Sequence, residues 1–375
     1  MCIRDRCCYA TSSVKVPLSK ISLKNFRCFN EINFSLSSGI NFFYGSNGSG
    51  KTSILEAVYI FSSGKSFKSS NLISLINYDR DKFCVKGYDN KKGYIVDIEK
   101  NRNKPISVVL NNKKITASKL LKEFPCTAIH NSTFSFADAS PDFRRKLLDR
   151  SIFTSDESFS KCWFTYYRTL KQRNSLLKNN RISDIYTWNQ KLSIEGDKLN
   201  NYRTNFFNKT ITEFKLLLDL IKPNDVFNFF DVIDINFFQG WETKKNFNDV
   251  LNNNISTDLK RKTTTAGPHK ADIKFLIKKI DARQVLSRGE QKFFSILWSC
   301  AQHEVLKKQF KVHATLLVDD IKSELDDRVF NLFLNLLNHV DTQIIFSCID
   351  DCFSSKITSS FNNFKKFHVE HLRQL

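Results

Sequence analysis

The stretch Gly45-Ser46-Asn47-Gly48-Ser49-Gly50-Lys51-Thr52 fits the pattern GxxxxGK[ST] and decides the fold of this chain. An apolar run over residues 40–44 precedes it, and helix-spaced apolar residues follow it from Ile54. A strand, a glycine-rich loop and a helix in this order form a phosphate-binding loop, because backbone N–H groups and the positive helix end converge on an anion. We expect these eight residues to bind ATP or GTP, with Lys51 at the β- and γ-phosphates and Thr52 on Mg²⁺.

Two acids, Asp319 and Asp320, follow a second apolar run at residues 314–318. A carboxylate at the end of a buried strand is typical of the element that faces Mg²⁺ in such sites, so we expect Asp319 on the metal side. Asp320 then stands where a general base could orient the attacking water. Taken alone, an aspartate pair after a strand could equally cap the next turn. The phosphate loop in the same chain favours the catalytic interpretation.

A third segment precedes a helical run over residues 293–306 and consists of Ser287, Arg288, Gly289 and Glu290. A serine at a helix N-terminus can bind an anion, but alone it is more often an ordinary helix cap. The order of the three segments resembles that of the ABC-type ATPase heads. The resemblance implies an ATP-dependent homodimer in which this signature segment of one subunit closes over the γ-phosphate held by the other. A loop that crosses the dimer interface is then expected at Ser323, Glu324 and Asp326.

The spacing of apolar residues predicts the organisation of the chain. Short runs predict strands near residues 21–26, 32–36, 85–88, 94–98, 106–110, 273–277, 314–318 and 343–346, and long amphipathic runs predict helices at 143–153, 159–179 and 185–220. We therefore expect an α/β fold, with an ABC-type P-loop ATPase head of mixed β-sheet and helices and an inserted α-helical lobe. The expected parts are a leader, unstructured or non-native, at residues 1–13, an ATPase lobe at 14–135 and 262–375, and a helical lobe at 136–261.

The composition suggests a polyanionic partner. The chain carries 58 Lys and Arg against 38 Asp and Glu, a formal charge of +20, which favours nucleic acid. AT-rich coding could also give a lysine-rich surface without any such partner. Candidate DNA contacts in the helical lobe are Arg144, Arg145, Lys171 and Arg173, although the pair Arg144 and Arg145 could instead brace the two lobes through acids such as Asp149.

Cysteine spacing and hydropathy predict the compartment. The ten cysteines show neither zinc-site nor disulfide spacing, and no apolar run approaches the roughly 18 residues of a membrane span. We expect a cytoplasmic protein with reduced thiols and no membrane contact.

Several further stretches resemble the RecF family of bacterial recombination mediators, over nearly the whole chain from about Val14. They are Leu23–Arg27, Leu55–Ala57, Gly64–Ser70, Pro141 with Arg144, Arg145, Leu148 and Asp149, then Leu170–Asn174, and Gly267–Lys270 followed by Asp272. Two departures concern the site and its surroundings: Glu290 replaces the family's usual glutamine, and Ala271 replaces one acid after the Gly-Pro-His segment.

The resemblance implies a weak ATPase that acts as a switch in DNA replication, DNA damage repair and the SOS response. It implies two ATP-bridged heads that hold single-stranded, gapped or junction DNA, and that assist RecA loading together with RecO and RecR. Three other classes stay open at this point. They are an SMC-like ATPase with another role, which should show an extended heptad segment, a transporter ATPase subunit, and a DNA-binding module that does not hydrolyse ATP. Ser347, where transporters usually carry histidine, disfavours the transporter.

Overall fold

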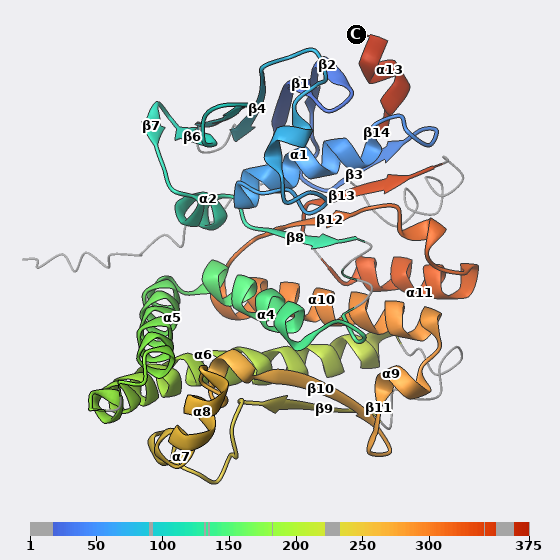
Figure 1. Ribbon diagram of the computed structural model, residues 1–375. Coiled ribbons are helices and arrows are strands. Elements are labelled where there is room, and N and C mark those ends of the chain that lie inside the picture. The colour runs from blue at the N-terminus through green and yellow to red at the C-terminus, as the bar shows by residue number, and fades with distance from the viewer. Residues whose placement is uncertain are drawn as a thin grey trace, which may run out of the picture.

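The computed structural model describes residues 18–89, 93–130, 133, 136–181, 183–221, 233–340, 342–349 and 364–374. The leader expected at residues 1–13 lies outside the described residues. In Figure 1 two sheet layers lie above a layer of helices, and a small third sheet lies beneath them.

The outermost layer is an antiparallel sheet with strand order β2-β1-β4-β5-β6-β7. Its strands are β1 (Lys20–Phe26), β2 (Phe29–Ser35), β4 (Lys82–Asp89), β5 (Tyr94–Asn101), β6 (Ser107–Leu110) and β7 (Lys113–Lys114). Alternate residues point to one face, as period-2 alternation predicts, and pack on a helix that crosses beneath the sheet. That helix is α1 (Lys51–Ser63), and α2 (Ala117–Glu123) and the 3-10 turn η1 (Leu72–Leu75) flank it.

The central layer is a parallel sheet with strand order β14-β3-β13-β12-β8. The strands are β3 (Ile40–Tyr44), β8 (Cys126–Ile129), β12 (Thr315–Val318), β13 (Ile344–Cys348) and β14 (Phe364–His368). Phe43 and Leu317 face the core around α1, whereas Phe42 and Val318 face the core of the helical layer. Both faces are therefore covered, which explains the continuous apolar runs. Because the strands are parallel, their carboxyl ends meet at one edge, where such folds bind ligands.

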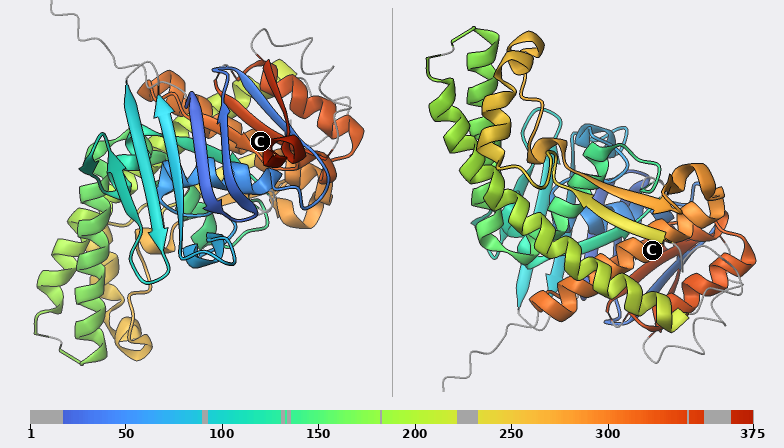
Figure 2. Two further views of the ribbon diagram at one scale, coloured as in Figure 1. Left: turned by 90° about the horizontal axis from the view of Figure 1, so that it is seen from above. Right: turned by 90° about the horizontal axis from the view of Figure 1, so that it is seen from below.

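The helical layer is built around two long helices, α6 (Ile185–Ile221) and α10 (Arg288–Phe310). The other helices of this layer are α4 (Pro141–Ser155), α5 (Glu157–Lys178), α7 (Phe247–Asn253), α8 (Ile255–Arg261) and α11 (Asp327–Asn338). Midway along α6, Tyr202 hydrogen-bonds Ser158 of α5. Further along, Phe214 packs on Trp298 of α10. Figure 2 shows α5 and the start of α6 projecting as an arm away from the sheets, with α7 and α8 alongside.

The small third sheet joins the two predicted lobes. Strand β9 (Ile233–Phe238) pairs with β10 (Asp272–Ile277), which also pairs with β11 (Ile280–Asp281). The predicted lobe boundary between residues 261 and 262 lies between β9 and β10, so the lobes share a sheet and one hydrophobic core. The remaining short elements are η4 (Pro268–Lys270), α9 (Ala282–Val285), η5 (Ile321–Ser323) and α13 (Val369–Gln374).

Each predicted strand and helix has a counterpart in the structure, with ends shifted by a few residues. The polar stretch before residue 262 was not expected to contain β9, α7 and α8, and β14 and α13 were also missed. Across the part of the chain that the structure describes, no helix has the length and apolar character needed to cross a membrane.

Candidate functional site

The phosphate loop joins β3 to α1 at the carboxyl edge of the parallel sheet. Its three glycines, Gly45, Gly48 and Gly50, have φ of 151°, 81° and 112°, values that favour glycine. At Gly50 a Cβ would also lie 2.5 Å from the Phe29 ring, so no side chain fits there. The glycines therefore bring the loop tightly round to the first turn of α1, as the sequence pattern predicts.

Lys51 is buried and bonds to the loop itself. Its ammonium group donates to the carbonyl oxygens of Gly45 and Ser46, at 2.7 and 2.8 Å. A buried ammonium must be hydrogen-bonded, and these two carbonyls satisfy it without an anion. A phosphate group could replace them as the partner of Lys51.

Asp319 meets the phosphate loop from the neighbouring part of the sheet. Its Oδ1 accepts hydrogen bonds from the hydroxyls of Thr52, at 3.1 Å, and Ser347, at 2.8 Å. Three oxygen-bearing side chains from α1, β13 and the end of β12 thus converge. Hard oxygen donors of this kind suit Mg²⁺, so the donor set fits the metal implied by the motif.

Asp320 lies at the end of the same strand in a left-handed conformation, with φ 44°. Its N–H donates to the Ser347 hydroxyl, at 2.9 Å, which fixes the turn. Its Oδ1 is buried without a hydrogen-bond partner among the described residues. An unpaired buried carboxylate oxygen is costly, which is typical of a functional group that awaits water or ligand.

Burial shifts the titration of both acids. Desolvation raises the pKa of Asp319 above 3.8, and the hydrogen bonds from Ser347 and Thr52 partly oppose it. Desolvation also raises the pKa of Asp320, opposed by Ser323 and by the positive charge of Lys51. A raised pKa makes a carboxylate a better proton acceptor, as a general base requires.

Arg27 lines the same site and was not assigned a role from the sequence. Its guanidinium makes two hydrogen bonds of 3.0 Å to the carboxylate of Glu56, which is 1% exposed. Ser66 also donates to Glu56, and Arg27 reaches the carbonyl of Ser74 at 3.2 Å. Residues from three of the family-like stretches therefore meet in one hydrogen-bonded group, which orients Arg27 at the pocket.

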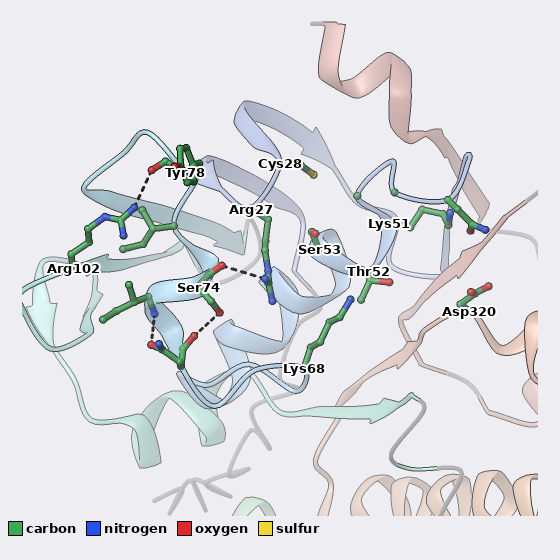
Figure 3. A pocket seen from close by; sticks show the side chains of 16 residues that line it. Arg27, Cys28, Lys51, Thr52, Ser53, Lys68, Ser74, Tyr78, Arg102 and Asp320 are labelled. Carbon is green, nitrogen blue, oxygen red and sulfur yellow. Dashed lines mark hydrogen bonds between the residues drawn. The ribbon is translucent and has the colours of Figure 1, made fainter.

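These elements enclose an open cavity of about 690 Å³. That volume lies within the roughly 300–1,000 Å³ of small-molecule sites. In Figure 3, Lys51 and Asp320 lie at one end of the cavity, Tyr78 and Arg102 lie at the other, and Arg27 and Lys68 project between them. We call this cavity the nucleotide pocket. Its other lining residues are Cys28, Asn47, Gly48, Gly50, Thr52, Ser53, Asn71, Ile73, Ser74 and Ile76.

The signature segment lies outside the nucleotide pocket: Ser287, Arg288, Gly289 and Glu290 are all described, and none lines it. Ser287 instead caps α10. The Glu290 N–H donates to the Ser287 hydroxyl at 3.4 Å, and the Ser287 N–H donates to the Glu290 carboxylate at 2.6 Å. This reciprocal capping box gives Glu290 a structural use that the family's glutamine could also serve.

The predicted interface loop connects Asp320 to α10. The Ser323 hydroxyl donates to the carbonyl of Asp320, at 2.8 Å. Glu324 pairs with Lys292 in the second turn of α10, at 2.6 Å. Asp326 caps α11 by accepting from the N–H of Val329, at 3.0 Å. Asp320 and the signature helix are therefore linked through a few hydrogen bonds.

Two of the four predicted DNA contacts do not agree with the structure. Arg173 is 0% exposed and pairs with Asp258, also 0% exposed, at 2.7 Å. Arg144 is buried and makes two hydrogen bonds to Asp272, at 2.8 and 3.0 Å. Both guanidinium groups are enclosed by their partners and so cannot reach a DNA backbone in this conformation.

Arg145 is mostly enclosed as well, because it donates to the carbonyl of Ala271 at 2.6 Å, whereas Lys171 is exposed. The structure therefore fits the alternative in which Arg144 and Arg145 brace the two lobes better than it fits DNA contacts. The acid that pairs with Arg144 is Asp272 and not Asp149. The partner of Asp149 is Arg203, with two bonds of 2.7 Å. We call the three enclosed pairs the buried arginine network: Arg144–Asp272, Arg173–Asp258 and Arg203–Asp149.

The fold and the site define an ABC-type ATPase head of the RecF/SMC class. The family described as "RecF/RecN/SMC N terminal domain" matches residues 17–370. Among solved structures, the chain is similar to "the recombination mediator protein RecF-ATP in RecFOR pathway", with TM-score 0.78 at 23% identity, covering 96% of this chain and 98% of that one. It is less similar to the Smc head bound to the C-winged helix domain of ScpA, with TM-score 0.56 at 15% identity, covering 93% of each.

Two relatives with known names identify the family within this class. The DNA replication and repair protein RecF of Shewanella frigidimarina is 33% identical over 94% of this chain and 97% of its own length. The RecF protein of Shewanella denitrificans is 33% identical over 95% of this chain and 98% of its own length. The chain belongs to the RecF family. The expected fold class, an ATPase head with an added helical part, is thereby confirmed.

Proposed function

We propose that this protein binds DNA in an ATP-dependent manner during recombinational repair and replication, and that slow ATP hydrolysis ends each binding event. One observation carries the proposal. Thr52, Asp319 and Ser347 form a hydrogen-bonded group at the phosphate loop, beside Asp320, whose Oδ1 has no partner within the described structure. A buried oxygen without a partner at this position is available to a water or ligand beside the phosphate loop. The names of the RecF relatives support the role in DNA repair.

In the proposed cycle, the amides of residues 48–52 and the ammonium of Lys51 bind the phosphates, and Lys51 exchanges its two backbone carbonyls for them. Thr52 and Asp319 would hold Mg²⁺, which neutralises charge on the β- and γ-phosphates. Asp320 accepts a hydrogen bond from the attacking water and orients it.

The second copy completes the site. Because Ser287 is exposed and lies outside its own pocket, we propose that it meets the γ-phosphate bound by the partner, in an ATP-bridged homodimer. Binding energy at the γ-phosphate then favours the closed dimer, and hydrolysis removes it. The link from Asp320 through Ser323 and Glu324 to α10 supports coupling of the two events.

The proposed DNA contacts lie on the arm. One face of α5 carries exposed basic residues at helical spacing, whose side chains make no hydrogen bond or ion pair within the described residues; they are Lys161, Arg168, Lys171 and Lys178. Free cations along a helix can neutralise successive phosphates without reading sequence. Lys161, Arg168 and Lys178 replace Arg144 and Arg173 as candidates, and Lys171 is retained.

The wider role follows from the family alone. We propose single-stranded, gapped or junction DNA as the substrate, RecO and RecR as partners in RecA loading, and the cytoplasm as the compartment. The similar solved structures are of RecF in the RecFOR pathway, which supports this assignment.

The decisive experiment combines Lys51→Ala with DNA binding. Gel shifts on duplex, single-stranded and junction DNA, each with and without ATP, should show ATP-stimulated binding for the wild type and none for the variant. Sedimentation should show ATP-dependent dimers only in the wild type. Lys24→Ala is the control, because Lys24 is an exposed lysine on β1. Equal DNA binding with and without ATP would contradict the proposed ATP-dependent switch.

A further inference from the structure

The strand near the end of the chain approaches the phosphate loop. β14 runs parallel to β3, and His368 lies opposite Tyr44 in the register. The chain leaves both strands at the same edge of the sheet. Two residues further along each segment stand Ser46, in the phosphate loop, and Glu370, in α13. The register therefore places a carboxylate beside a loop built to bind anions.

Glu370 bonds to that loop directly. Its Oε1 accepts from the N–H of Ser46, at 2.7 Å, and from the Ser46 hydroxyl, at 2.6 Å. A Cβ on Gly45 would lie 2.3 Å from the other carboxylate oxygen, so glycine is needed for Glu370 to approach. The hydrogen bonds from Ser46 lower the pKa of Glu370 to about 2, so it is ionised at neutral pH.

The short helix that carries Glu370 is anchored on both sides of it. Val369 is 0% exposed in the core around α1, and the Arg373 guanidinium lies 5.3 Å from the centre of the Phe29 ring. The imidazole of His368 lies 3.4 Å from the Glu370 carboxylate. The carboxylate is thus held in place by the packing of its neighbours.

We propose that Glu370 is a positioning residue for the phosphate loop, which makes the β14–α13 segment a part of the nucleotide site. This rests on the proposed ATP binding. In the structure two side chains hold the start of the loop. Lys51 donates to the carbonyls of Gly45 and Ser46, and Glu370 accepts from the N–H and hydroxyl of Ser46. When Lys51 turns to a phosphate, Glu370 remains and keeps the loop in its binding shape.

The proposal also predicts reciprocal coupling. If docking of α13 stabilises the phosphate loop, ATP binding must stabilise the docking of α13 by the same free energy. A contact that only anchored the end of the chain would not respond to nucleotide.

The test compares Glu370→Ala, Glu370→Gln and the control Glu31→Ala, an exposed glutamate on β2. Fluorescent N-methylanthraniloyl-ATP gives Kd, and turnover gives KM and kcat. Loss of hydrogen bonds to a charged group should raise Kd and KM by about 10- to 100-fold in Glu370→Ala, with kcat within about twofold. Glu370→Gln should recover part of this loss, because its amide oxygen still accepts from Ser46. The Glu31 variant should match the wild type.

The second readout is hydrogen exchange over residues 369–374, with and without ATP. ATP should slow exchange in the wild type and have no effect in Glu370→Ala. Unchanged Kd in Glu370→Ala, or equal losses in the Ala and Gln variants with no ATP effect on exchange, would overturn the positioning role. A wild type that does not bind the fluorescent nucleotide would instead overturn the proposed function.

Discussion

The phosphate-loop end of the nucleotide pocket and the buried arginine network use charged residues in opposite ways. In the pocket, Lys51 bonds only backbone carbonyls and the Oδ1 of Asp320 has no partner among the described residues, so the side chains point to a space that a ligand must fill. In the network, each arginine already has its acid, and Arg173 and Asp258 are both 0% exposed. Unpaired charge indicates chemistry, whereas paired and enclosed charge indicates architecture.

The largest effect is expected in the pocket, from Asp320→Asn. The change removes the proton acceptor, so ATP turnover should fall by about 10²- to 10⁴-fold. The variant should still bind ATP and remain in the closed dimer for longer. Because burial raises the pKa of Asp320, its ionised form is disfavoured in the fold, and the neutral amide should not lower stability.

Steady-state turnover, fluorescent-nucleotide Kd and urea unfolding check this prediction together. Normal turnover in Asp320→Asn would show that Asp320 is not the general base. A large loss of stability would show that the pocket and the network do not differ as proposed.

The next effect is expected in the network, from Arg173→Ala. Removing one partner of a buried pair leaves Asp258 uncompensated, which costs about 3–5 kcal/mol of folding stability. The hydrogen bonds of Arg173 to Asn189 and Thr264 are lost as well. Urea denaturation measures the change, and the matched control is Lys171→Ala, on the same helix but exposed. A stable Arg173→Ala protein with weakened DNA binding would restore the original DNA-contact prediction.

The sequence could predict the phosphate-loop end of the pocket because its parts are local, whereas Arg27, Tyr78 and Arg102 at the rest of the pocket were not predicted. The loop at residues 45–52 and the acids after β12 each follow a strand, and parallel strands deliver their ends to one edge. The fold class, the long helices and most strands follow from apolar spacing for the same reason.

The network could not be predicted in this way. Whether Arg173 or Lys171 faces solvent depends on how α5 packs against α6 and α8, and a run of charged residues does not reveal it. Only the neighbouring apolar residues give a signal: Leu170 and Leu177, with Arg173 between them, lie on the buried face at helical spacing. Glu370 was missed because its contact with Ser46 depends on the register of β14 and β3, which are far apart in sequence.

A smaller effect concerns His269, which lies beside the network. Burial lowers its pKa from 6.5 to about 4. The Nε2–H of the neutral ring donates to the carbonyl of Thr264, at 3.0 Å, and Nδ1 accepts from the Tyr166 hydroxyl, at 2.8 Å. Between about pH 6.5 and pH 4 the unfolded chain binds a proton that the folded chain does not, so stability falls as pH falls. His269→Gln should reduce this slope by up to about 1.4 kcal/mol per pH unit.

Urea midpoints at several pH values between 7 and 4.5 measure that slope, and exposed His339→Gln should leave it unchanged. Equal slopes in His269→Gln and the wild type would mean that His269 titrates normally and that the network admits water.

The smallest effect is expected at Lys171, an exposed residue of α5. Lys171→Ala should change stability by less than about 0.5 kcal/mol, because the side chain is exposed and makes no ion pair within the part of the chain that the structure describes. DNA affinity should fall a few-fold on every sequence alike, and the slope of log K against log salt should shrink by about 0.7 to 0.9, the loss of one phosphate contact. Filter binding at several salt concentrations measures the slope, and Lys119→Ala on α2 is the control. An unchanged slope would mean that DNA does not follow this face of α5, and the free charges of the arm would then resemble those of any basic surface.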